Sequence, residues 1–308
     1  MLKAEHIALL AALNDDKQCR QRNACGRLRE LPGDRIGTLL ETYIDEKRGA
    51  NMLLRVNPVL DPFMRRNPSD ESLLRYQTII REYLDREVRI LTFWDDGYPA
   101  ILRNIPDPPL ILYVRGKVFP GNDGIAIVGT RAASERGYEL SCRFAKALAE
   151  EGHTIVSGLA TGIDTAAHEG ALDGGGTTIA VLAGHVDDIY PDQNVDLARR
   201  VTERGSIVSE ITPEAHTTKG RFVERNRITS GLSTAVVVVE TGKTGGTIRQ
   251  VEYATSQKRP IYVIDHGRFE RPEAQEGFMH LTRLGATPVR NPSELSELLT
   301  DAAPSCAR

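Results

Sequence analysis

Two segments, each an apolar run that leads into a glycine-rich turn, constrain the fold of this chain more than any other feature. The first extends from Gly124 to Arg131 and reads Gly-Ile-Ala-Ile-Val-Gly-Thr-Arg. The second extends from Ile155 to Asp164 and reads Ile-Val-Ser-Gly-Leu-Ala-Thr-Gly-Ile-Asp. Short unbroken apolar runs are typical of parallel strands that are covered on both faces. Each segment therefore predicts a buried strand, a tight glycine turn and then a helix.

The alternation of strand and helix patterns continues to about residue 300. Crossovers of this length predict an α/β protein with a parallel, doubly wound sheet. Ligands of such sheets bind at the carboxyl ends of the strands, so the loops that follow the strands are expected to share one rim. The predicted strands cover residues 125–128, 154–157, 178–182, 206–209, 235–239, 260–264 and 287–289, and the predicted helices cover about 135–151, 164–173, 194–204, 222–233, 247–257, 275–284 and 293–299.

The first part of the chain follows helical spacing instead. Apolar residues such as Leu73, Ile80 and Leu84 recur on one helical face. Short strand patterns then precede the main sheet. The predicted organisation is a helical N-terminal module at 1–88, a bridging segment at 89–123, the α/β domain at 124–300 and a frayed tail at 301–308.

Charge and cysteine usage exclude several function classes. The net charge of -3 over 308 residues gives no overall attraction to nucleic acid or membranes, so a basic site has to be local. Cys19, Cys25, Cys142 and Cys306 form no Cys-x-x-Cys pair and have no histidine at metal-ligand spacing. They are predicted to be free thiols, with no metal site and no cofactor. No apolar window is long enough to span a membrane, and a cytoplasmic protein is expected.

The two glycine turns predict an anion-binding site. Helix N-termini present free N–H groups, which suit a phosphate or a carboxylate. Arg131 would add a charged phosphate contact, and Ser134 is placed to cap the following helix. The alternative is that these are ordinary strand–helix turns and that Arg131 is a surface residue. The phosphate-binding residues predicted from the two turns are Gly129, Thr130, Arg131, Ser134, Ser157, Gly158, Thr161 and Gly162.

A basic segment on the same predicted rim reads Lys219-Gly-Arg-Phe-Val-Glu-Arg-Asn-Arg227. Cations neutralise phosphates and an aromatic ring stacks a base, which contributes roughly 1–3 kcal/mol per base in single-stranded nucleic acid binding. Lys219, Phe222, Arg225 and Arg227 are therefore predicted to bind DNA. The alternative is an amphipathic helix with Phe222 in the core, in which Arg225 and Arg227 pair with carboxylates such as Glu240.

A third feature of the predicted rim reads Gly184-His-Val-Asp-Asp-Ile-Tyr-Pro191. His185, Asp187 and Asp188 are residue types that carry acid–base chemistry. A strand-end turn with Tyr190 packed underneath explains the same residues equally well. No nucleophile with an oriented base is found, and no catalytic residue is predicted.

Several separated motifs, in the right order, resemble the DNA-processing protein DprA (Smf) family. They include Ile127-Val-Gly-Thr-Arg131, the run from Ser157 to His168, Phe222-x-x-Arg-Asn-Arg-Ile-x-x-Gly-Leu-Ser233, and Val238-Val-Glu240. The resemblance implies an extended Rossmann-like domain that binds single-stranded DNA, forms a homodimer and loads a RecA-type recombinase in natural transformation. By this resemblance Arg131, Lys219 and Phe222 match the DNA-contacting arginine and lysine and the base-stacking phenylalanine. A non-catalytic single-stranded DNA-binding protein is expected.

One region departs from the pattern of that family. Lys243-Thr-Gly-Gly-Thr-Ile-Arg-Gln250 stands where the family has a serine- and glycine-rich helix start, and Val263-Ile-Asp-His-Gly267 replaces a Val-Pro-Gly. The Gly-Gly-Thr start resembles the LOG nucleotide phosphoribohydrolases, in which it binds phosphate and a nearby glutamate is catalytic. It adds Gly245, Gly246 and Thr247 to the predicted phosphate-binding residues. Gln250 cannot act as a general base, which argues against hydrolysis and leaves nucleotide binding open as the alternative.

Overall fold

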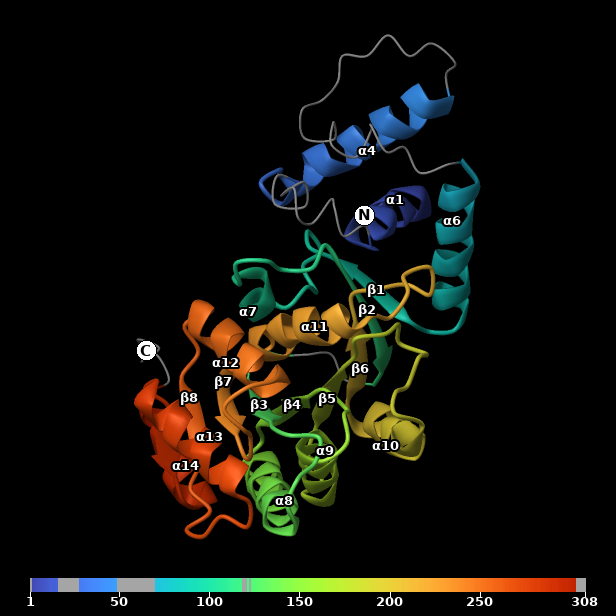
Figure 1. Cartoon of the computed structure of the whole chain (residues 1–308). Helices are drawn as coiled ribbons and strands as arrows, with labels where there is room; N and C mark the ends of the chain where they lie inside the picture. Colours follow the sequence, from blue (N-terminus) through green and yellow to red (C-terminus); the bar gives the residue numbers. More distant parts are fainter. Residues whose placement is uncertain (1, 16–27, 49–69, 118–120, 122, 303–308) are drawn as a thin grey trace. The chain divides into compact units, whose positions relative to one another are not determined.

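A computed structural model describes residues 2–15, 28–48, 70–117, 121 and 123–302 of the chain (Figure 1). Cys19, Cys25 and Cys306 lie outside the described residues, and Cys142 is a free thiol. The chain forms two compact units, and the predicted bridging segment 89–123 contributes residues to both. The smaller unit contains Met1–Tyr98, Pro109–Val114 and Ser209–His216, and the larger unit contains Pro99–Pro108, Arg115–Val208 and Thr217–Arg308.

The larger unit is built on parallel strands, as the apolar runs predicted. Each predicted strand of the region is present, with ends that differ by at most two residues. The strands are β3 (Gly124–Val128), β4 (Thr154–Ser157), β5 (Thr178–Val181), β6 (Ser206–Ser209), β7 (Ser233–Val238), β8 (Ile261–Ile264) and β9 (Thr287–Val289). They lie in the order β6-β5-β4-β3-β7-β8-β9, and each neighbouring pair is parallel. The order reverses between β3 and β7, which is the topological switch point of a Rossmann-like sheet.

Helices cover both faces of this sheet (Figure 1), which confirms the predicted fold class. Alternate residues of β3 point to opposite faces. Ile125 and Ile127 pack in one core with Phe144, whereas Ala126 and Val128 pack in a second core with Val251. The longer helices are α8 (Glu135–Glu150), α9 (Ile163–Asp173), α10 (Val195–Arg204), α11 (Lys219–Gly231), α12 (Gly246–Ser256), α13 (Pro272–Arg283) and α14 (Pro292–Ala302), and the short ones are α7 (Ala100–Arg103) and η1 (Asp192–Asn194).

The smaller unit combines helices with an antiparallel strand pair. The register of the pair runs from Arg89 opposite Val114 to Thr92 opposite Ile111. None of the helices in the described part of the chain is long and apolar enough to cross a membrane. The elements are α1 (Ala4–Asp15), α4 (Gly33–Arg48), α6 (Asp70–Asp85), β1 (Arg89–Thr92) and β2 (Ile111–Gly116), of which β2 ends in the larger unit.

Asn14 joins three separate stretches of the smaller unit. Its Nδ2 donates to the Glu210 carbonyl at 2.6 Å, and its Oδ1 accepts from the Leu110 backbone N–H at 3.1 Å. The residue is only 2% exposed. Because buried backbone groups need partners, this one side chain satisfies two groups that no regular element pairs.

We expect Asn14→Leu to lower the free energy of unfolding of the smaller unit by about 2–4 kcal/mol, since two backbone groups each lose a buried hydrogen bond to Asn14. Trp94 is the only tryptophan of the chain and belongs to the same unit. Its fluorescence during urea unfolding measures the change. Glu71→Ala is the control, because the Glu71 side chain is 81% exposed. A urea midpoint equal to that of the parent would contradict this role for Asn14.

Candidate nucleic-acid interface

A pocket of about 770 Å³ lies at the carboxyl ends of β3 and β7. These strands are neighbours at the point where the strand order reverses, which is where open α/β sheets bind ligands. The loops after β3 and β7 and the first turns of α11 and α12 form its walls. Nine of the predicted site residues line it, namely Gly129, Thr130, Arg131, Lys219, Phe222, Arg225, Gly245, Gly246 and Thr247.

The loop after β3 is held tightly against its neighbours. The Thr130 N–H donates to the Glu240 carbonyl at 2.8 Å, and the Ile163 N–H donates to the Thr130 carbonyl at 3.2 Å. A Cβ at Gly129 would lie 2.7 Å from the Glu240 carbonyl oxygen and 2.6 Å from Ile163. Only glycine allows this close approach of the chains.

Two of the predicted residues support this loop from the side. Gly162 has φ 79°, and a Cβ there would lie 2.5 Å from the Thr130 carbonyl oxygen. The Thr161 hydroxyl donates to the Arg131 carbonyl at 3.2 Å. Thr161 and Gly162 therefore position the backbone of Arg131 and do not line the pocket.

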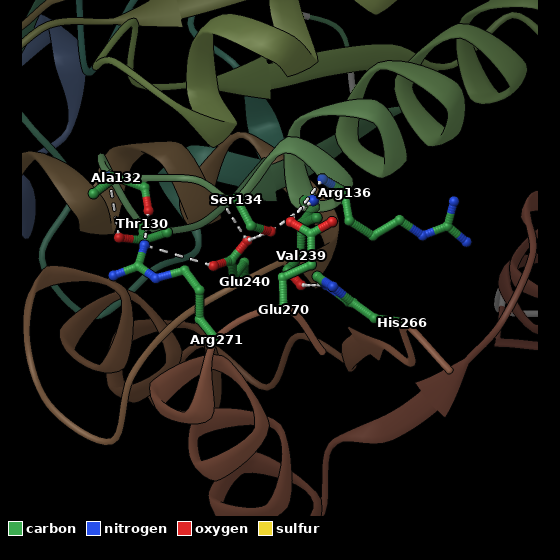
Figure 2. A network of polar contacts seen from close by, with 10 residues as sticks. Thr130, Ala132, Ser134, Arg136, Val239, Glu240, His266, Glu270 and Arg271 are labelled. Carbon is green, nitrogen blue, oxygen red and sulfur yellow. Dashed lines mark hydrogen bonds and ion pairs between the residues drawn. The ribbon is translucent and has the colours of Figure 1, made fainter. Parts of the chain in front are cut away.

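Ser134 caps α8, as predicted, because its Oγ accepts from the Gly137 N–H at 2.9 Å. Its own N–H and hydroxyl both donate to Oε2 of Glu240, at 3.0 and 2.6 Å (Figure 2). Glu240 is 3% exposed. An internal carboxylate thus lies beside the start of α8, where the sequence predicted a bound phosphate. The polar groups of Ser134 are engaged inside the protein.

The second glycine turn supports a buried arginine. Ser157 is fully buried, and its hydroxyl donates to the Ile127 carbonyl at 2.7 Å, so it lies away from the pocket. The guanidinium of Arg225 packs directly against Gly158, where any side chain would overlap it. Gly158 therefore provides the space for Arg225 and does not line the pocket itself.

Arg225 is a buried cation in the pocket wall. Burial lowers the pKa of Arg225, while the nearby Asp164 raises it and the charge of Arg131 lowers it again. Burial likewise raises the pKa of Asp164, and Arg225 opposes that change. Nε of Arg225 has no hydrogen-bond partner among the described residues. Two arginines that repel each other across a pocket favour an anion between them.

Phe222 lies in the pocket and not in the core. The guanidinium carbon of Arg131 lies 5.0 Å from the centre of the Phe222 ring. The Tyr190 ring meets Phe222 edge-on, with centroids 5.9 Å apart. Tyr190 is 56% exposed, so the interpretation that it packs underneath a turn is wrong. The three side chains form a surface of aromatic rings and a cation.

The starts of α11 and α12 contribute further donors. Lys219 is the first residue of α11 and makes no ion pair with any described residue. Neither α11 nor α12 has a side-chain hydrogen bond at its N-cap, which is Thr218 in one and Gly245 with φ 112° in the other. Uncapped helix N-termini leave N–H groups for an anion.

Arg227 differs from Arg225 in position and role. It is 5% exposed, and its Nε lies 3.2 Å from Asp107. The alternative prediction, that this arginine pairs with a carboxylate, is therefore correct for Arg227. The carboxylate is that of Asp107 and not that of Glu240. The prediction that Arg227 contacts DNA finds no support in the pocket geometry.

Two residues that the sequence did not single out for binding tie α11 to α12. Nδ2 of Asn226 donates to the Gly246 carbonyl at 3.1 Å, and Nε2 of Gln250 donates to the Asn226 carbonyl at 2.9 Å. Both line the pocket. In the sequence, the only indication that Asn226 belongs to the pocket was its position between two arginines.

The acid–base interpretation of the turn after β5 finds no support. Asp187 forms an ion pair with Arg115 at 2.5 Å, and Asp188 accepts from the Thr217 hydroxyl at 3.1 Å. Nδ1 of His185 accepts from the Asp187 backbone N–H at 3.3 Å. These contacts hold the turn and leave no aligned nucleophile and base among these residues.

Fold and site together define a Rossmann-like α/β protein with a pocket of basic and aromatic side chains at its switch point. The chain belongs to the DNA recombination-mediator protein A family, whose model matches residues 89–300. This match confirms the resemblance to the DprA (Smf) family.

Known relatives agree with this assignment. The chain is 35% identical over 223 residues to Protein Smf of Synechocystis, a match that covers 70% of this chain and 55% of that protein, so the chain spans about half its length. The structure of DNA processing protein A from Streptococcus pneumoniae superposes with a TM-score of 0.67 at 31% identity, covering 84% of this chain and 91% of that one. DNA processing protein A from Helicobacter pylori, whose structure concerns its single-stranded DNA binding mode, superposes with a TM-score of 0.62 at 28% identity, covering 70% and 97%.

Proposed function

We propose that this protein binds single-stranded DNA in the pocket at the carboxyl ends of β3 and β7 and acts, without catalysis, in DNA processing. The observation that carries the proposal is the contact of Arg131 with the Phe222 ring at 5.0 Å, with Lys219 and Arg225 in the same pocket. Cations beside an aromatic ring match the chemistry of a single strand. The single-stranded DNA binding of the Helicobacter relative supports the same ligand.

The binding mode follows from the chemistry of the walls. Arg131, Lys219 and Arg225 neutralise phosphates, and the uncapped starts of α11 and α12 donate to phosphate oxygens. A base stacks on the surface formed by Phe222 and its neighbours. Stacking and phosphate contacts do not depend on base identity, so the sequence preference is weak and the salt dependence steep.

The family assignment also supports proposals about partners. We infer that the chain forms a homodimer and that a RecA-type recombinase receives the bound strand in recombination. Sedimentation of the protein alone tests the dimer. Assembly of a recombinase on an oligonucleotide, with and without this protein, tests the transfer.

A small nucleotide is the second candidate ligand, because α12 begins without a side-chain cap and a Cβ at Gly245 or Gly246 would meet nothing within 4 Å. Hydrolysis is disfavoured in this pocket. Gln250 is 2% exposed and its amide donates to a backbone carbonyl, and an amide is no base. Glu252 is paired with Arg249 at 2.7 Å on the exposed side of the helix.

We expect Phe222→Leu to weaken binding of a labelled oligothymidine by about 5- to 100-fold, because it keeps apolar volume but removes the ring that stacks a base. Fluorescence anisotropy at low and moderate salt measures the affinity. Phe93→Leu, which changes a half-buried aromatic residue of the smaller unit outside this pocket, is the matched control. A mononucleotide competitor belongs in the same titration. A parent protein that binds the mononucleotide but no oligonucleotide would favour the second candidate.

A further inference from the structure

We propose that Arg271, which does not line the pocket, is a positioning residue for DNA binding. It holds the segment that carries Arg131 through the carbonyl of Ala132 and the carboxylate of Glu240. The role rests on the proposed function of the pocket, because Arg131 is one of its DNA contacts.

Arg271 reaches the pocket loop from a distant part of the chain. It is the N-cap residue of α13, in the loop that follows β8. Its Nη1 donates to the carbonyl of Ala132, the residue directly after Arg131 (Figure 2). The same nitrogen lies 3.8 Å from Oε1 of Glu240. One side chain thus contacts both the loop and the carboxylate beneath it.

Glu240 needs this cation. Its side chain is 2% exposed, and its Oε2 already accepts two hydrogen bonds from Ser134. Among the described residues, Arg271 is the only cationic side chain within 4.0 Å of this carboxylate. A buried carboxylate is costly unless it is hydrogen-bonded and paired. Arg271 therefore supports the contact between Glu240 and the start of α8.

The loop has other anchors at Thr130 and Arg131. Thr130 is bonded to the backbone of Glu240, and the Arg131 carbonyl is bonded to Thr161. In the described part of the chain, Arg271 is the only hydrogen-bond partner of the Ala132 carbonyl. Without Arg271 that carbonyl is released next to Arg131. Ordering this segment when DNA binds would then cost free energy and weaken the observed affinity.

The loop that carries Arg271 has contacts of its own. Arg271 follows Val263-Ile-Asp-His-Gly267, where the sequence departs from the family pattern. The same stretch places His266 against the Val239 carbonyl at 2.7 Å and against the Phe269 ring at 4.7 Å. These contacts fix the loop that delivers Arg271 to Ala132.

A double-mutant cycle separates positioning from a general effect on folding. Oligonucleotide affinity is measured by anisotropy for the parent, Arg271→Ala, Arg131→Ala and the double variant. We expect Arg271→Ala to weaken binding about tenfold, and this loss to shrink to about twofold or less in the Arg131→Ala background. In the Lys219→Ala background the tenfold loss persists. Arg290→Ala, whose side chain is 79% exposed, is the matched control.

Hydrogen–deuterium exchange gives a readout that does not need DNA. Arg271→Ala is expected to speed exchange of the amides in residues 130–134, while Arg290→Ala leaves them unchanged. Unchanged affinity of Arg271→Ala beside a binding parent overturns the role of Arg271 alone. The role is also overturned if Arg271→Ala weakens binding by the same factor in the Arg131→Ala background as in the parent. A parent that binds no oligonucleotide overturns the proposed function, and the positioning role with it.

Discussion

The variant Arg131→Glu/Lys219→Glu is expected to bind single-stranded DNA at least about 100-fold more weakly than the parent at low salt. Both side chains line the pocket, and neither forms an ion pair with a described residue. Each substitution removes a phosphate contact and adds a charge that repels the phosphate. The slope of log affinity against log salt should also fall by about 1.4, since each lost contact with a single strand contributes about 0.7.

The control for this variant has the same net charge. Lys146→Glu/Arg199→Glu also changes the charge by -4, and the two parent side chains are 52% and 69% exposed on α8 and α10. Neither residue lines the pocket. A large loss confined to Arg131→Glu/Lys219→Glu places the DNA in the pocket. Equal losses in the two variants would mean that overall charge, and not this site, controls binding.

The second large expected effect is a loss of stability in acid that depends on His168. The residue is fully buried, and burial, with a smaller contribution from Arg225, lowers its pKa to about 3. Its Nδ1 lies 2.7 Å from the Thr178 hydroxyl, which itself donates to the Ile155 carbonyl at 2.9 Å. Nδ1 therefore carries the proton in the neutral ring, and Nε2 has no partner among the described residues.

The sign of the effect follows from proton binding. The unfolded chain binds a proton at His168 near its ordinary pKa of 6.5, but the folded protein binds it only near pH 3. Stability is fully present above pH 6.5 and falls as the pH drops from 6.5 toward 3. The slope approaches about 1.4 kcal/mol per pH unit for one such group.

We expect His168→Gln to remove this part of the acid sensitivity, because glutamine keeps an amide donor but does not titrate. Urea unfolding followed by circular dichroism between pH 7.5 and pH 4 measures the free energy of unfolding of both proteins. The difference, parent minus variant, should fall by roughly 2–3 kcal/mol between pH 6 and pH 4. Parallel curves for the two proteins would show that His168 is accessible to protons in the folded state.

The amino-acid sequence by itself determined the sheet and the rim on which the pocket lies. Strands buried on both faces have to be largely apolar, so β3 to β8 were visible as short, mostly apolar runs. Close approach of two backbones requires glycine, so the turn at Gly129 was visible as well. Parallel strands also place the loops that follow them at one edge, which brought Arg131, Lys219 and Phe222 to the same predicted site.

Only the tertiary structure decided what each polar residue contacts. Arg225 and Arg227 are two residues apart and look equivalent in the sequence, but successive helix positions turn by about 100°, so they face different surroundings. One lines the pocket beside Asp164, and the other pairs with Asp107, 120 residues away in the chain.

The same holds for Glu240 and Arg271. Neither the bond from Arg271 to Ala132, across 139 residues, nor the bond from Ser134 to Glu240, across 106, has a signal in local sequence. Local pattern reports which face of a strand or helix is buried, because burial repeats with the period of the element. It does not report which distant side chain fills the remaining space. Which distant side chains meet depends on how the helices and strands pack together, and these contacts shape the pocket.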